Sequence, residues 1–131
     1  MSGYERGWLA GLPWESVIAI NAALCAEGNA QHGCTSEGGY EAASTAWENA
    51  RKAGRMHFAE LAVLCKECHR LSPFLFYNGN TFVVIIRRLC SELPLGAPGQ
   101  AAVRQIAGHM VAGVLPPEEE RQFIRRLRSR K

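Results

Sequence analysis

The sequence contains no aspartate, and all twelve of its acidic residues are glutamates. This absence excludes an EF-hand calcium loop, a magnesium site held by aspartate and a Ser-His-Asp triad, because each of them uses the shorter carboxylate. No glutamate stands in a recognisable catalytic setting either. The sequence therefore leaves enzymatic activity undecided and favours a protein without catalysis of its own.

Long apolar runs are also missing. No stretch approaches the roughly 20 apolar residues that a membrane-spanning helix needs. The N-terminus lacks the basic start and the apolar core of a secretory signal. We therefore expect a cytoplasmic protein with reduced thiols, since five cysteines without regular spacing do not suit a disulfide framework.

Positive charge is concentrated at the C-terminus. Residues 121–131 carry six cations and no acid, namely Arg121, Arg125, Arg126, Arg128, Arg130 and Lys131. Residues 1–120 carry nine cations against twelve glutamates, so the net charge of +3 combines a body of −3 with a tail of +6. Such a tail can bind nucleic-acid phosphates, an anionic membrane surface or a protein partner, or it can be a solvated helix that aids solubility.

Apolar residues recur at helical spacing along most of the chain, whose 131 residues suffice for one domain. The pattern predicts helices over 13–27, 40–53, 55–71 and 101–115, one more after the Asn78-Gly79 turn, and a sixth after Pro116-Pro117. With short connections these give an all-α fold of about six helices, as stacked helical hairpins or a compact bundle. We expect an irregular lead-in at 1–12, a helical domain at 13–115 and a basic C-terminal helix or tail at 116–131.

Residues 74–86 can be interpreted in two ways. Asn78-Gly79 between aromatic and β-branched residues is a strong β-hairpin signal, which would make the fold mainly α with one hairpin. Alternatively, Asn80 or Thr81 caps a helix that continues to Leu93. We favour the helix, because a strand would have to stop before Arg87 whereas the helical period continues beyond it.

Residues Cys65 to His69 have the sequence CKECH, which matches c-type haem attachment, but the pattern is short and no export signal accompanies it. Cys65 and His69 share a helix face with Cys68 nearby, so zinc could bind if His32 or Cys34 supplied a further ligand. Alternatively, the cysteines are core residues and His69 is a cation at the helix end. A redox dithiol is disfavoured, because the helix C-terminus opposes a thiolate. We expect no cofactor, with zinc as the alternative.

Four consecutive apolar residues, Phe74 to Tyr77, follow the third predicted helix. They cannot all point inward, so we expect one or two to be exposed as anchors for a protein partner or for self-association. The predicted binding residues are Phe74, Phe76, Tyr77, Arg87 and Arg88, with the two arginines at the rim. The sequence thus favours a small helical interaction or adaptor protein, with a zinc or thiol site and nucleic-acid binding through the tail as alternatives.

Overall fold

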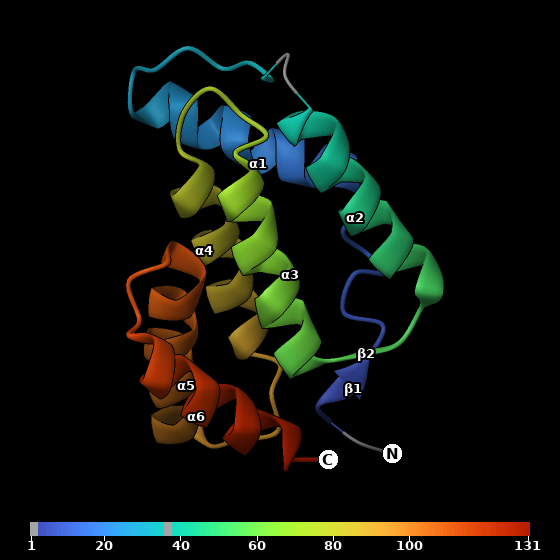
Figure 1. Ribbon diagram of the computed structural model, residues 1–131, viewed down its shortest axis with the longest axis vertical. Coiled ribbons are helices and arrows are strands. Elements are labelled where there is room, and N and C mark those ends of the chain that lie inside the picture. The colour runs from blue at the N-terminus through green and yellow to red at the C-terminus, as the bar shows by residue number, and fades with distance from the viewer. Residues whose placement is uncertain (1–2, 36–37) are drawn as a thin grey trace.

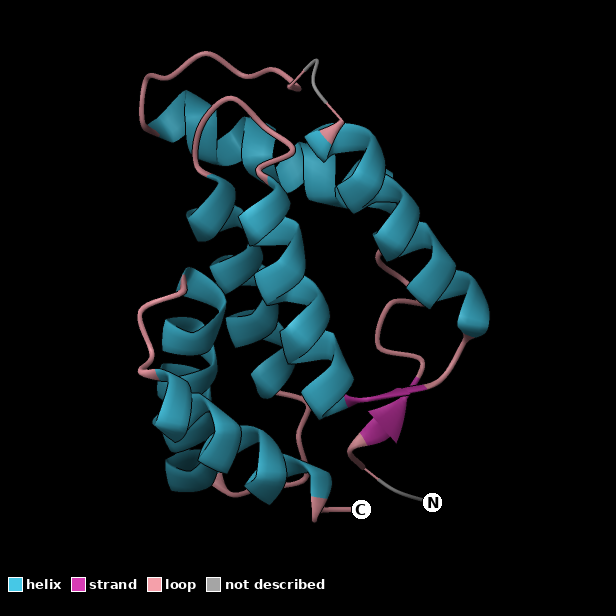
Figure 2. Ribbon diagram, viewed as in Figure 1, coloured by secondary structure: helices cyan, strands magenta, loops and turns pink. Residues whose placement is uncertain are grey.

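Six helices and one short antiparallel ladder make up the computed structural model, which describes residues 3–35 and 38–131 (Figure 1 and Figure 2). The helices are α1 (Trp14–Glu27), α2 (Gly39–Ala53), α3 (Phe58–Leu71), α4 (Asn78–Cys90), α5 (Ala97–Ala112) and α6 (Pro117–Arg128), and the strands are β1 (Glu5–Arg6) and β2 (Met56–His57). The predicted helical fold with about six helices is therefore confirmed. None of the described helices is long and apolar enough to cross a membrane.

Helix α3 is the centre of the core. It packs against α2, α4, α5 and α6, which surround it in Figure 1. Its buried stripe consists of Phe58, Ala59, Leu61, Ala62, Cys65 and Cys68. Residues three and four apart lie on one face of a helix, so the apolar spacing in the sequence places these side chains on the face that packs against the other helices.

The N-terminal segment, for which the sequence predicts irregular structure, contributes to the core. Its residues 1 and 2 lie outside the described residues. Strand β1 pairs antiparallel with β2, placing Glu5 opposite His57 and Arg6 opposite Met56. Trp8 and Leu9 are buried, and the Trp8 ring meets Phe58 edge to face with ring centroids 5.2 Å apart. Because Met56 and His57 are taken up by this ladder, α3 begins at Phe58 rather than at 55.

The hairpin alternative for residues 74–86 is wrong, and the favoured helix is confirmed as α4. The helix begins at Asn78, however, before the expected caps at Asn80 or Thr81. Asn78 Oδ1 accepts a hydrogen bond from the Phe74 backbone N–H at 2.9 Å, and its Nδ2 donates to the Phe74 carbonyl at 2.8 Å. The asparagine therefore fastens the preceding loop to the first helical turn instead of forming a hairpin turn.

Candidate functional site

The loop between α3 and α4 exposes the largest apolar side chains of this region. We call residues 74–77 the aromatic loop. Phe74 is buried among Trp14, Tyr40 and His32, whereas Leu75 and Phe76 are 44% and 50% exposed. The structure thus divides the four apolar residues into one core residue, two exposed ones and a half-buried Tyr77.

The backbone of the aromatic loop is fixed from three sides. Asn78 holds Phe74 from α4, as described above. The segment 33–35 pairs with it as an antiparallel bridge, in which the Leu75 N–H donates to the Gly33 carbonyl at 3.0 Å and the Thr35 N–H donates to Pro73 at 2.9 Å. From α1, Asn21 Nδ2 donates to the Phe76 carbonyl at 2.8 Å.

Asn21 is the centre of a buried polar network beneath the loop. Its Nδ2 also donates to Thr81 Oγ1 at 3.0 Å, and Thr81 in turn donates to the Tyr77 carbonyl at 2.7 Å. Its Oδ1 lies 2.9 Å from His32 Nδ1 and accepts a longer contact from Cys25 Sγ at 3.6 Å. Because both amide hydrogens of Asn21 are used, Oδ1 is an acceptor and His32 Nδ1 carries the proton of that bond.

A groove of about 380 Å³ opens on another part of the surface. We call it the α1–α4 groove. It is lined by Gly7, Trp8, Gly11 and Leu12 of the N-terminal segment, Ile20 of α1, and Val84, Ile85, Arg88 and Leu89 of α4 with Glu92 beyond it. Most of these side chains are apolar, and the charged residues of the lining are Arg88 and Glu92.

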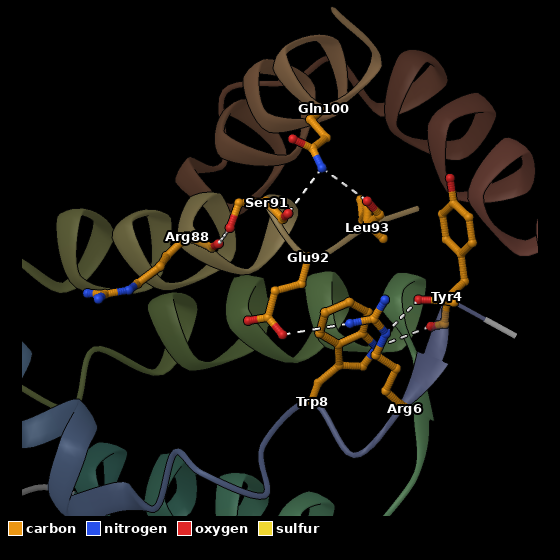
Figure 3. A network of polar contacts seen from close by, with 9 residues as sticks. Tyr4, Arg6, Trp8, Arg88, Ser91, Glu92, Leu93 and Gln100 are labelled. Atoms are coloured by element: carbon orange, nitrogen blue, oxygen red, sulfur yellow. Dashed lines mark hydrogen bonds and ion pairs between the residues drawn. The ribbon is translucent and has the colours of Figure 1, made fainter. Parts of the chain in front are cut away.

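Figure 3 shows the charged residues of the groove, Arg88 and Glu92, with the polar contacts around them. Arg6 lies over the Trp8 ring, 4.9 Å from the ring centroid, and its Nη1 is 3.7 Å from Glu92 Oε1. Trp8 Nε1 donates to the Tyr4 carbonyl at 3.1 Å, which fixes the indole. The side chain of Arg88 points away from this pair along α4 (Figure 3). Glu92 therefore pairs with Arg6 and not with Arg88.

Arg87 and Arg88 do not share a surface. Arg87 turns toward α5, where it lines a small cleft with Ala101, Arg104 and Gln105. A Cβ at Gly108 would come within 2.6 Å of Arg87 Nε, so the glycine allows this close approach. Both arginines lie about 15 Å or more along α4 from the aromatic loop, at 1.5 Å per residue, so neither forms a rim around Phe76.

The cysteines of the CKECH segment belong to the core. Burial raises the pKa of the Cys68 thiol to about 12, and burial together with the neighbouring Cys68 and Cys90 raises the pKa of Cys65 well above its ordinary value. Cys68 Sγ donates to the Ala43 carbonyl at 3.8 Å. A metal-binding or nucleophilic cysteine must be a thiolate, which these surroundings disfavour.

The remaining residues of the predicted zinc site are dispersed. His69 Nδ1 lies 2.8 Å from the Val111 carbonyl, His32 contacts Asn21, and Cys34 is exposed in the bridge beside Phe74. Among residues 3–35 and 38–131, no three His, Cys or Glu side chains are placed to hold a metal ion together. Zinc binding stays a prediction that this arrangement does not support.

The basic C-terminal segment forms α6, which docks on the body through Phe123 and Leu127, as its apolar edge suggests. Arg121 pairs with Glu118, and Arg128 lies 3.6 Å from Glu60. Lys66 of α3 pairs with Glu120 at 2.6 Å and ties the start of the helix to the core. Arg125 and Arg126 are exposed and have no ion pair with the described residues.

The α1–α4 groove could not be predicted from the sequence, because Trp8 and Leu12 lie in a glycine-rich segment whose apolar residues follow no helical or strand period. One signal was available. Residues 17–26 of α1 contain no charge and show no polar face, although several of them, including Ala19, Ala23 and Ala26, are exposed. A helix that is apolar on all sides and only partly covered indicates exposed apolar surface near it, although the residue that α1 contributes to the groove is Ile20 and not one of these alanines.

Comparison with known proteins gives no indication of function. No protein-family model matches the chain, and neither the curated proteins nor the solved structures contain a significant match.

Proposed function

We propose that this protein is a non-catalytic helical interaction domain that binds a protein partner through the aromatic loop. The observation that carries the proposal is Phe76, a half-exposed aromatic side chain on a backbone that hydrogen bonds fix from three sides. Aromatic anchors of this kind dominate the binding energy of many interfaces. An anchor that is already ordered loses little conformational entropy on binding.

The expected contribution of Phe76 follows from its exposed area. Half of a phenylalanine side chain corresponds to about 100 Å², whose burial in an interface contributes about 2 kcal/mol. Replacing Phe76 with serine should therefore weaken partner binding roughly thirtyfold. The backbone bonds of the loop do not use this side chain, so the variant should fold normally.

The test begins by placing a photo-crosslinking phenylalanine analogue at position 76 in cells. The matched control carries it at position 114, where Val114 is 68% exposed just beyond the C-terminal end of α5 and lies outside the aromatic loop. A partner crosslinked only from position 76 is then purified, and its affinity is measured by calorimetry against the parent, Phe76→Ser and Val114→Ser. Equal affinities for all three proteins would refute the proposal.

Self-association is the other form of the same function. Sedimentation velocity over a wide concentration range distinguishes it, because a dimer that uses the aromatic loop should dissociate in Phe76→Ser and persist in Val114→Ser. If the parent protein is a monomer at every concentration, it does not bind itself, and the partner must be a different polypeptide.

Nucleic-acid binding through α6 is a second candidate, and it is favoured by Arg125 and Arg126, which are exposed and form no ion pair with a residue that the structure describes. Deleting residues 121–131 is not a clean test, because Phe123 and Leu127 would leave the core with them. We instead propose Arg125→Gln with Arg126→Gln. In a duplex-DNA titration, the double variant should reduce the slope of log K against log salt by about 2. Binding that is absent or insensitive to salt would exclude this candidate.

A further inference from the structure

The α1–α4 groove has no role in the proposed interaction. It lies between three segments distant in sequence, the N-terminal residues 7–12, α1 and α4. Its floor is formed by Leu12, Ile20, Val84, Ile85 and Leu89. Val84 is 39% exposed at the middle of α4, although it is a β-branched apolar residue. The volume of about 380 Å³ is within the range of small-molecule sites.

Arg88 supplies the groove with an uncompensated charge. Glu92, the acidic residue of the lining, is engaged by Arg6. Within residues 3–35 and 38–131, no acidic side chain forms an ion pair with Arg88. A guanidinium binds a carboxylate through two parallel hydrogen bonds, so the charge invites an anion of that shape.

We propose that the α1–α4 groove binds a small amphiphilic carboxylate, with its apolar chain on the floor of the groove and its carboxylate at Arg88. The apolar chain of such a ligand matches the apolar lining and its carboxylate matches the guanidinium of Arg88, whereas Glu92 already has a cationic partner in Arg6. In an isologous dimer residue i of one copy contacts residue j of the other, so a second copy would have to present an acidic side chain beside apolar ones to fill the groove in the same way. That occupant is one of the outcomes of the test.

Titration calorimetry with straight-chain carboxylates from hexanoate to dodecanoate tests the proposal on the full chain. Each added methylene should improve the affinity about fourfold until the groove is full, after which the affinity should level off. Decanol, which has the chain without the charge, should bind about tenfold more weakly than decanoate. In Arg88→Gln this difference should disappear, because decanoate then binds as weakly as decanol.

A matched pair of surface variants locates the binding. Val84→Glu places an acid on the floor of the groove and should abolish decanoate binding. Val63→Glu is the control, because Val63 is also a helical valine with 39% exposure but lines a different cavity on α3. Both changes are at the surface, and circular dichroism verifies that both variants are folded.

Three results would overturn the proposal: no binding of millimolar decanoate to the parent, equal binding to Val84→Glu and Val63→Glu, or an affinity independent of chain length. A dimer that Val84→Glu dissociates would also overturn it, because the groove would then hold a second copy. Phe76→Ser should bind decanoate as the parent does, so this experiment is independent of the proposed protein interaction.

Discussion

Replacing Asn21 with alanine should release the aromatic loop from the body. The Asn21 amide donates to the Phe76 carbonyl at 2.8 Å and to Thr81 Oγ1 at 3.0 Å, and it accepts from His32 Nδ1 at 2.9 Å. The side chain is completely buried, so water cannot substitute for these bonds in the folded protein. Alanine removes all three bonds and leaves a cavity the size of an amide group.

The size of the effect follows from these bonds. A buried hydrogen bond contributes about 1 kcal/mol net, so the loss should be about 3 kcal/mol of the free energy of unfolding. For a domain of this size that corresponds to a decrease in Tm of roughly 10 °C. It is a large part of the total stability, since small domains are stable by only about 5–15 kcal/mol.

Urea unfolding followed by tryptophan fluorescence measures this loss, because Trp14 and Trp47 are buried in the core near the network. Asn49→Ala, on the exposed side of α2, is the control and should change the stability by less than about 0.5 kcal/mol. Hydrogen exchange at the Leu75 amide should become faster in Asn21→Ala only. A loss below about 1 kcal/mol, or unchanged exchange at Leu75, would show that Asn21 does not hold the loop.

Three further predictions concern the cysteines and the start of α3. Under native conditions a thiol reagent should modify only Cys34 rapidly, and denaturation should expose all five thiols; rapid reaction of a second thiol in the native protein would contradict the buried assignments. Because the pKa values of Cys68 and Cys90 are raised to about 12 in the folded state, the contribution of these two thiols to stability should be constant from neutral pH to about pH 9 and fall between pH 9 and 12. Alkaline urea titrations should show a slope that is smaller in Cys68→Ala by up to about 1.4 kcal/mol per pH unit, and an unchanged slope would contradict the burial of this thiol. His57 is the N-cap of α3, and its Nδ1 accepts a hydrogen bond from the Ala59 N–H at 3.0 Å. His57→Ala should therefore lower the free energy of unfolding by about 1 kcal/mol, whereas His57→Asp should retain the cap. Equal losses in the two variants, measured by thermal unfolding, would show that the cap does not stabilise the helix.

The helices could be predicted from the sequence wherever a local pattern determines them. The stripe of α3 and the apolar edge of α6 lie on single faces, so their burial follows from spacing alone. The start of α4 could not be predicted in this way. It depends on where the Asn78 amide finds its partners, and those are backbone groups of Phe74 in a loop that has no period.

The candidate sites were harder to predict, because they depend on contacts between distant segments. Arg87 and Arg88 are adjacent in sequence, but successive residues of a helix point about 100° apart, so one reaches α5 and the other the α1–α4 groove. That Phe76 is exposed while Phe74 is buried depends on the bridge to residues 33–35, which no local pattern reveals. Proximity in sequence therefore indicated exposed residues near Phe76, but not which of the neighbouring residues lie beside it.

The pairing of β1 with β2 also determines how the domain can be attached to other molecules. His57 Nε2 lies 2.8 Å from the Arg130 carbonyl, so residues near both ends of the chain meet at the N-terminal end of α3. The aromatic loop lies at the opposite end of α3, as Figure 1 shows. A fluorophore, a surface tether or a fused domain at either end would therefore leave Phe76 accessible. For the same reason, a short linker joining the two ends should yield a circular permutant in which both the loop and the groove are retained.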